Sequence, residues 1–156
     1  MVPRQAFLVF AAVMLLFTPP AAHSDDLDDL KATFEQEVKA FNSRDFSTFV
    51  ATAHEQVVLF GHFPPFELKG IEAYRQRYQT LFSNNQSVTF TPLTPQFRVI
   101  GNVGVAWGHD KLVLKPKDGP SVTYSGRYTF VYTKADGKWL RVVVHASPEP
   151  TPPTTP

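Results

Sequence analysis

Arg127 and His145 are the two side chains of this sequence best suited to chemistry. They lie in two strand-forming segments that flank an Asp136-Gly137 pair, a strong hairpin signal. If Thr133 pairs with Trp139, the alternation of side chains along the strands places Arg127 opposite His145. An arginine offers a fixed fork of donors to a carboxylate or another anion, and a histidine beside it can donate, accept or carry a proton.

The same two residues also have a purely structural interpretation, in which their donors bond to backbone carbonyls or to a helix end. A guanidinium group close to His145 disfavours the imidazolium form, so we expect a neutral imidazole in either case. The sequence leaves open whether Arg127 and His145 bind a ligand or support the fold.

Four further residues are candidates for the walls of a pocket around this pair. Trp107 and His109 share one face of a predicted strand, Tyr78 lies on a predicted helix, and His62 lies in an aromatic-rich loop. Together they could enclose a flat apolar ligand, although aromatic residues at such spacing also form ordinary cores. The histidines come from separate segments without the close spacing typical of zinc ligands, so we expect no metal and no cofactor.

The elements that must position these residues are read from hydrophobic periodicity. The pattern predicts helices over 25–41 and 46–53, a short strand over 56–60 and a proline-containing loop over 61–66. A third helix over 71–82 then precedes a run of strands over 87–147. Pro92 and Pro95 interrupt the first long strand, which indicates an edge position or a bulge. Segregated helices and strands predict an α+β fold, in which a strongly bent, mostly antiparallel sheet wraps around the first helix and leaves a cone-shaped cavity.

Length and composition predict a single domain, preceded by a signal peptide and followed by a proline-rich tail. Residues 1–24 show the pattern of a secretory signal peptide, with Arg4, a nearly continuous apolar run and small residues before the predicted cleavage site. A retained membrane anchor is the alternative, but the run is shorter than the roughly 18 residues needed to span a bilayer. We therefore expect cleavage, export to the periplasm or the exterior, no stable membrane insertion afterwards, a domain over 25–147 and a disordered proline-rich tail over 148–156.

Charge and cysteine content exclude several classes of function. Loss of Arg4 with the signal peptide leaves 14 basic and 14 acidic residues, and no basic cluster is evident, so nucleic-acid binding is not expected. The chain has no cysteine, which removes thiol catalysis and cysteine-based metal sites.

Several segments resemble one known superfamily when they are taken in order. The strongest are Gly126 to Val131, Asp136 to Trp139 and His145 to Ser147, preceded by Leu59 to His62 and by the turn at Gly101-Asn102. They resemble the SnoaL-like branch of the nuclear-transport-factor-2-like superfamily, over residues 25–147. The closing strand is also similar to that of the calcium/calmodulin-dependent kinase II association domain.

This resemblance implies a conical α+β fold of the cystatin-like type and a tendency to form homodimers through the sheet. It does not imply one activity, because the superfamily includes isomerases, cyclases, dehydratases, binding modules and oligomerisation domains. Its steroid isomerases carry an aspartate just after the second helix, whereas residues 58–62 of this chain contain no acid. That departure argues against isomerase chemistry of this type.

The sequence thus predicts an exported domain that binds a small, partly apolar and anionic ligand without a cofactor. Arg127 and His145 would anchor its polar end, with the pocket candidates His62, Tyr78, Trp107 and His109 around it. Two alternatives stay open. The domain could be an oligomerisation module with an incidental cavity, or a cofactor-free isomerase, cyclase or dehydratase that uses a pocket histidine as general acid–base.

Overall fold

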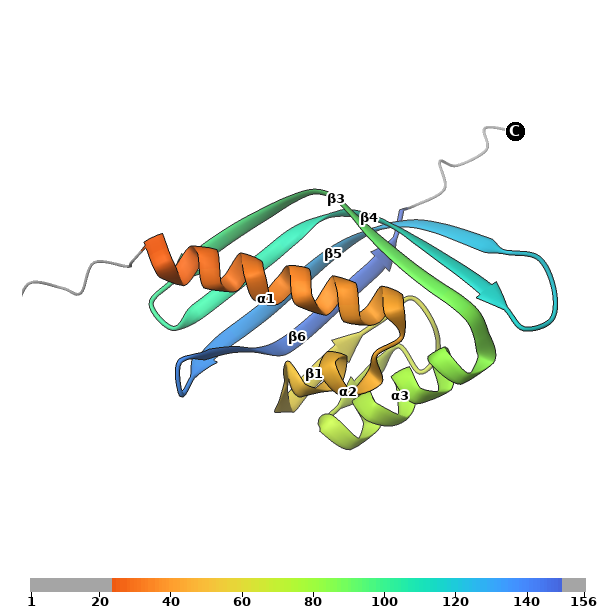
Figure 1. Ribbon diagram of the computed structural model, residues 1–156, viewed down its shortest axis with the longest axis horizontal. Helices are drawn as coiled ribbons and strands as arrows, with labels where there is room; N and C mark the ends of the chain where they lie inside the picture. The colour runs from red at the N-terminus through yellow and green to blue at the C-terminus, as the bar shows by residue number, and fades with distance from the viewer. Residues whose placement is uncertain (1–23, 150–156) are drawn as a thin grey trace, which may run out of the picture.

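The computed structural model describes residues 24–149 and shows three helices and six strands (Figure 1). The predicted signal peptide, apart from Ser24, and residues 150–156 of the predicted tail lie outside the described residues. In chain order the elements are α1 (Ser24–Ser43), α2 (Phe46–Ala51), β1 (Ala53–Phe60), β2 (Glu67–Lys69), α3 (Ile71–Asn84), β3 (Asn85–Ile100), β4 (Val103–Pro116), β5 (Val122–Ala135) and β6 (Lys138–Pro148).

The strands form one open sheet in the order β2-β1-β6-β5-β4-β3. All neighbours pair antiparallel except β1 and β6, which run parallel. The predicted α+β class and the mostly antiparallel sheet with an N-terminal helix are confirmed. The three-residue strand β2 was not predicted, because the sequence around it is dominated by the proline-containing loop.

Helix α1 lies along one face of the sheet, which we call the inner face (Figure 1). Its residues Leu30, Phe34 and Phe41 are buried, at steps of four and seven residues that bring side chains onto one stripe. Gly104 of β4 allows close approach, because a Cβ atom there would lie 2.9 Å from two methyl carbons of Leu30. The helix therefore packs directly onto the long strands.

Strand β3 is a long edge strand with the predicted irregularity at its prolines. The register with β4 shifts between Leu93 and Gln96, and Thr94 adopts a positive φ of 44°. The side chain of Asn42 at the end of α1 bonds both the N–H and the C=O of Phe90, with distances of 2.7 and 3.1 Å. An amide side chain thus holds the end of α1 against this strand.

A bulge in β6 decides which side chains of the last strand point inward. Tyr132 pairs with Arg141 and Val131 pairs with Val143, which leaves Val142 as an extra residue between them. Before the bulge, odd-numbered residues such as Arg141 are buried. After it the buried residue is Val144, and His145 is exposed. The predicted register was wrong: Thr133 pairs with Leu140, and Arg127 pairs with Ser147 rather than His145.

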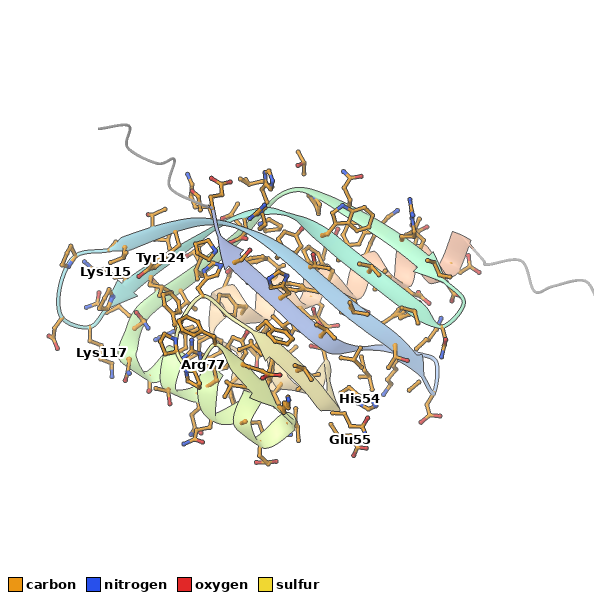
Figure 2. All side chains as sticks on the ribbon, turned by 180° about the vertical axis from the view of Figure 1, so that it is seen from behind. His54, Glu55, Arg77, Lys115, Lys117 and Tyr124 are labelled. Carbon is orange, nitrogen blue, oxygen red and sulfur yellow. The ribbon has the colours of Figure 1, made fainter. Side chains whose placement is uncertain are left out.

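The other face of the sheet, which we call the outer face, is not covered by any helix within residues 24–149 and is turned toward the viewer in Figure 2. Four valines pair across β1, β6, β5 and β4 to form one apolar row: Val58, Val143, Val131 and Val105. Phe60 is 44% exposed at the end of β1 and lies opposite His145. One face of the sheet is therefore covered by helices, and the other is an open surface with apolar and polar side chains.

Candidate functional site

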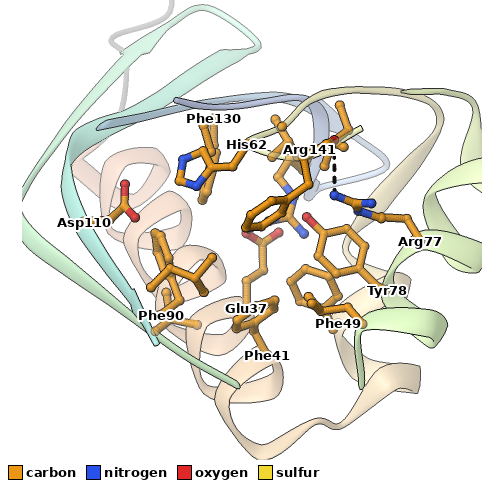
Figure 3. A pocket seen from close by; sticks show the side chains of 18 residues that line it. Glu37, Phe41, Phe49, His62, Arg77, Tyr78, Phe90, Asp110, Phe130 and Arg141 are labelled. Atoms are coloured by element: carbon orange, nitrogen blue, oxygen red, sulfur yellow. Dashed lines mark hydrogen bonds and ion pairs between the residues drawn. The ribbon is translucent and has the colours of Figure 1, made fainter. Parts of the chain in front are cut away.

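A partly enclosed cavity of about 110 Å³ lies between the inner face of the sheet and the helices α1 and α3 (Figure 3). Its walls are mainly aromatic and aliphatic: Val38, Phe41, Phe49, Leu59, Phe63, Tyr78, Leu81, Phe90, Leu112, Phe130, Val144 and Ala146. Five acidic or basic side chains interrupt them, namely Glu37, His62, Arg77, Asp110 and Arg141. An apolar pocket with a few polar groups is the usual form of a small-molecule site.

A buried ion pair forms one polar end of this cavity. Glu37 of α1 and Arg141 of β6 are each 2% exposed, and Arg141 Nη1 lies 3.4 Å from Glu37 Oε2. Tyr132 donates its hydroxyl hydrogen to the same carboxylate oxygen at 2.7 Å, and Arg141 Nη2 donates to the Tyr74 hydroxyl at 2.6 Å. Two helices and two strands thus meet at one network of buried polar groups.

The network is compensated in charge but incomplete in hydrogen bonds. Glu37 Oε1 and Arg141 Nε are buried and have no hydrogen-bond partner. The Arg141 guanidinium also lies against the rings of Phe49 and Phe130, with distances of 4.8 and 5.4 Å to their centroids. Buried polar atoms normally have partners, so the two free atoms mark a place where a ligand could bind.

Burial and charge act on the pKa values of this network in opposite directions. Burial raises the pKa of Glu37, although the Arg141 charge and the Tyr132 hydroxyl oppose it. Burial disfavours the charged form of Arg141, but the negative charge of Glu37 outweighs this and raises its pKa. Burial also raises the pKa of Tyr74 and Tyr132 well above the usual value, so both phenols stay protonated.

Asp110 and His62 form a second polar group in the cavity wall. Asp110 is 2% exposed, and its Oδ1 atom has no hydrogen-bond partner. It pairs directly with Gly126 on β5, and a Cβ atom at Gly126 would lie 3.1 Å from two atoms of the His62 ring. Directly paired residues on one face are separated by only about 5 Å at their Cβ positions. The imidazole of His62 therefore occupies the place beside Asp110 that a side chain at position 126 would take.

The environment shifts the pKa of each of these groups in the direction that disfavours its charged form. Burial, assisted by the charge of Glu149 and opposed by His109, raises the pKa of Asp110 to about 6. Burial lowers the pKa of His62, with the Ser147 backbone opposing the shift and His145 adding to it. Neither ring nitrogen of His62 has a hydrogen-bond partner of regular geometry, and the Ser147 backbone is the polar group that interacts with the ring. A buried carboxyl with a pKa near 6 beside an imidazole is an arrangement that can transfer protons.

The loop that carries His62 is held against α3 by one arginine. Arg77 donates from Nη1 to the Pro64 carbonyl at 3.2 Å and from Nη2 to the Phe63 carbonyl at 3.4 Å, the second of which is drawn in Figure 3. Its guanidinium carbon also lies 5.8 Å from the centroid of the Phe63 ring. These contacts fix the loop over the cavity wall.

The structure brings together two of the six residues predicted for the pocket. His62 and Tyr78 line the cavity. Trp107, His109, Arg127 and His145 do not line it. They lie on the outer face, where His109 pairs with Arg127, Trp107 with Thr129 and Thr129 with His145. Alternation along β4 and β5 turns odd-numbered residues outward there, and the Val142 bulge does the same for His145 on β6.

The sequence analysis did not identify three buried polar residues of the cavity, Glu37, Asp110 and Arg141. For the first two, the pattern of neighbouring apolar residues indicates a buried position. Glu37 falls on the apolar stripe of α1, three residues after Phe34 and four before Phe41, where a charged residue is out of place. Asp110 alternates with Ala106 and Leu112 on the buried face of β4. Arg141 had no comparable marker, because its orientation depends on the bulge beside it.

Two absences can be stated for residues 24–149. No group of three or more histidine and acidic side chains is arranged to hold a metal ion. Within the same range, no helix has the length and apolar character required to cross a membrane.

Comparison with solved structures shows the fold. The model resembles a proposed dehydratase of the nuclear-transport-factor-2-like family from Streptomyces avermitilis, with a TM-score of 0.73, 17% identity, and 81% of this chain and 98% of that chain covered. It also resembles a proposed scytalone dehydratase from Novosphingobium aromaticivorans, with a TM-score of 0.72, 12% identity and coverages of 81% and 85%. At these identities the likeness establishes the nuclear-transport-factor-2-like fold alone.

A third structure and a family model agree with each other. The model resembles a proposed calcium/calmodulin-dependent protein kinase II association domain from Xanthomonas campestris, with a TM-score of 0.69, 22% identity and coverages of 78% and 86%. No curated protein matches the sequence. The family model of the calcium/calmodulin-dependent protein kinase II association domain matches residues 27–150 of this chain. With most of the chain matched, this protein belongs to the calcium/calmodulin-dependent protein kinase II association domain family and has the nuclear-transport-factor-2-like fold.

Proposed function

We propose that this protein is an exported, self-associating domain that binds a small, partly apolar molecule in the cavity of its inner face. The observation that carries the proposal is a set of buried polar atoms without partners in an otherwise apolar cavity, on Glu37, Arg141, His62 and Asp110. Each buried, unpaired polar group costs about 1–3 kcal/mol of stability. A ligand that pairs with them would recover part of this cost.

The residues proposed to bind the polar end of the ligand differ from those expected from the sequence. The expected anchors Arg127 and His145 lie on the outer face, and the cavity instead presents Arg141, which is paired with Glu37. A paired arginine does not favour an anion as a free arginine would. We therefore retain a partly apolar ligand but not the anionic charge that rested on Arg127.

The binding function is tested by native mass spectrometry of the mature protein purified from its own host. The expected result is a co-purifying small molecule that is absent from a Leu81→Trp variant, in which an indole fills the cavity. An Arg127→Ala variant on the outer face is the matched control and should retain the molecule. A clean, ligand-free protein, or loss of the molecule in the control variant instead, would contradict the proposal.

Export is proposed from the sequence pattern of residues 1–24. The test is the intact mass of the protein recovered from the host's exterior or periplasm, which should lack the first 22 or 24 residues. A full-length mass, or recovery of the protein only from the cell interior, would contradict export.

Self-association is supported by two observations that are independent of the cavity. The chain belongs to an association-domain family, and the valine row of the outer face, with Phe60 beside it, is not covered by any helix. Apolar surface of this kind is stabilised by burial against a second surface. We propose a homodimer formed through this face, and multi-angle light scattering of the purified protein tests it.

Catalysis is a second candidate function, and the pair formed by Asp110 and His62 favours it. A carboxyl with a pKa of about 6 is partly protonated near neutral pH and can both remove and return a proton. In heavy water, the wild-type protein should then speed exchange of carbon-bound hydrogen in the co-purified molecule, and Asp110→Asn should abolish the exchange without loss of binding. Absence of any exchange above the uncatalysed rate would reject this candidate.

A further inference from the structure

The free hydrogen-bonding atoms at the Glu37–Arg141 end of the cavity define the group that would fit there. Glu37 Oε2 is used by Tyr132 and Arg141, and Arg141 Nη2 is used by Tyr74. The two atoms of this pair that have no partner at all are an acceptor, Glu37 Oε1, and a donor, Arg141 Nε. Both side chains are 2% exposed, so bulk water does not satisfy these atoms.

A hydroxyl group matches this pair of atoms better than a charged group does. A hydroxyl can donate its hydrogen to Glu37 Oε1 and accept from Arg141 Nε–H at the same time. A carboxylate accepts only, so one of its oxygens would face Glu37 Oε1 without a hydrogen between them. An ammonium donates only and would leave Arg141 Nε unpaired.

The remaining charges of the cavity also favour a neutral ligand. Glu37 compensates Arg141, while Asp110 and Arg77 contribute one group of each sign. Arg77 already donates to the carbonyls of Pro64 and Phe63, which directs its donors to the loop. The donors of Arg77 are therefore directed away from a ligand, and the charge of Arg141 is compensated by Glu37.

The size of the cavity limits the ligand to a single ring. An apolar cavity of about 150 Å³ in another protein binds benzene. This cavity has about 110 Å³, so one six-membered ring is the upper limit for the enclosed part of a ligand. The rings of Phe41, Phe49, Phe90 and Phe130 line it and can pack against the faces and edges of such a ring.

We propose that the cavity binds a neutral compound with a single ring and a hydroxyl group, with that hydroxyl bridging Glu37 Oε1 and Arg141 Nε. The inference rests on the proposed binding function and specifies its ligand class. It differs from the anionic ligand expected from the sequence, and it excludes polycyclic compounds as ligands that are enclosed by the cavity.

The test compares four probe compounds by calorimetric titration of the full chain. Phenol has the proposed size and hydroxyl, fluorobenzene has the size without the hydroxyl, benzoate adds a negative charge, and 2-naphthol adds a ring. We expect phenol to bind at least about tenfold more tightly than each of the other three. A ligand that leaves a buried donor and acceptor without partners loses about tenfold or more in affinity.

A double variant, Glu37→Leu/Arg141→Met, tests the role of the two free atoms. Replacing a buried ion pair by apolar residues of similar volume is often tolerated, whereas removing one partner is not. The preference for phenol over fluorobenzene should fall to about onefold in this variant and stay unchanged in the outer-face control Arg127→Gln. Should the double variant fail to fold, the selectivity of the wild-type protein among the four probes decides by itself.

Each other outcome overturns the ligand class, and one of them also overturns the binding function. Tighter binding of benzoate rejects the neutral ligand, tighter binding of 2-naphthol rejects the size limit, and equal binding of phenol and fluorobenzene rejects the hydroxyl site, although the cavity would remain a binding site in all three. If no probe binds but a compound co-purifies, the class is wrong and binding stands. If no probe binds and nothing co-purifies, both proposals fail.

Discussion

The two faces of the sheet contain similar residues in very different surroundings. On the outer face Arg127, His109 and His145 are exposed, and on the inner face Arg141, Asp110 and His62 line a cavity. The inner set has buried atoms without partners and pKa values shifted by burial. The comparison shows that residue type suggests chemistry, whereas the face of the strand determines whether a residue can perform it.

The largest expected effect separates Arg141 from Arg127. Arg141→Met leaves the carboxylate of Glu37 buried without its counter-charge, so we expect a loss of about 3–5 kcal/mol in the free energy of unfolding. The same change at Arg127, on the exposed face, should cost no more than about 0.5 kcal/mol. Urea unfolding of both variants measures the difference.

Addition of Glu37→Gln to the Arg141→Met variant should recover part of this loss, because the uncompensated charge is then removed. Equal destabilisation by Arg141→Met and Arg127→Met would mean that the two faces do not differ in the way described.

The next effect depends on pH and concerns Asp110. Its pKa in the folded protein is about 6, above the ordinary value of 3.8, so the folded state prefers the protonated carboxyl. This group therefore destabilises the protein increasingly as the pH rises from about 4 through 6, by a total of about 2–3 kcal/mol. Relative to wild type, Asp110→Asn should gain this amount between pH 4 and pH 7.

The measurement is the free energy of unfolding at several pH values for wild type, Asp110→Asn and Asp118→Asn, the last being an exposed control with the same change of charge. The other titratable groups around Asp110, namely Glu149, His109, His62 and Tyr128, remain in every variant, so the three curves differ only in the presence of Asp110 or Asp118 and in its interactions. Parallel curves for all three proteins would contradict the buried environment of Asp110.

A smaller effect is expected when a charge is placed in the valine row of the outer face. If this face is buried between two copies, Val131→Glu should weaken self-association by about tenfold or more, which corresponds to about 1.4 kcal/mol. Gln36→Glu adds the same charge to the exposed side of α1 and should leave the dissociation constant unchanged. Sedimentation or light scattering over a range of concentrations distinguishes the two, and equal behaviour would place the interface elsewhere.

The smallest effect is expected for ligand binding after changes to the outer face. Arg127→Gln and His145→Gln should change the affinity for a cavity ligand such as phenol by less than about twofold, because neither residue lines the cavity. Leu81→Trp in the cavity wall is the contrasting variant and should abolish binding. A strong loss in either outer-face variant would show that the ligand binds on the other side of the sheet.

The elements of the fold were predictable because their signals are local. The stripe of α1 and the Asp136-Gly137 turn depend only on neighbouring residues, and the positive φ values of 49° and 76° in that turn agree with the hairpin interpretation. The buried position of Glu37 could also have been predicted from the sequence, since this residue interrupts the apolar stripe of α1.

The orientation of the last strand was not predictable in this way. An alternating pattern identifies the buried face only where buried and exposed residues differ in type. Val142, Val143 and Val144 are identical, so the sequence contains no marker for the extra residue of the bulge. Uninterrupted alternation would put Arg141 and His145 on one face, whereas the bulge leaves Arg141 on the inner face and His145 on the outer face. The outer position of Trp107, His109 and Arg127 has a separate cause, because the alternation along β4 and β5 did not settle which face of the sheet is concave.

The parallel pairing of β1 with β6 has a consequence for the order in which the protein folds. The two strands are about 90 residues apart in the chain, and β6 lies between β1 and β5 in the sheet. Until residues up to Pro148 have been synthesised, β1 and β2 cannot join the other strands, and Arg141 is not yet available to neutralise Glu37. Such long-range contacts slow folding, so completion of the sheet and closure of the cavity are expected as late, concerted steps rather than during synthesis of the N-terminal half.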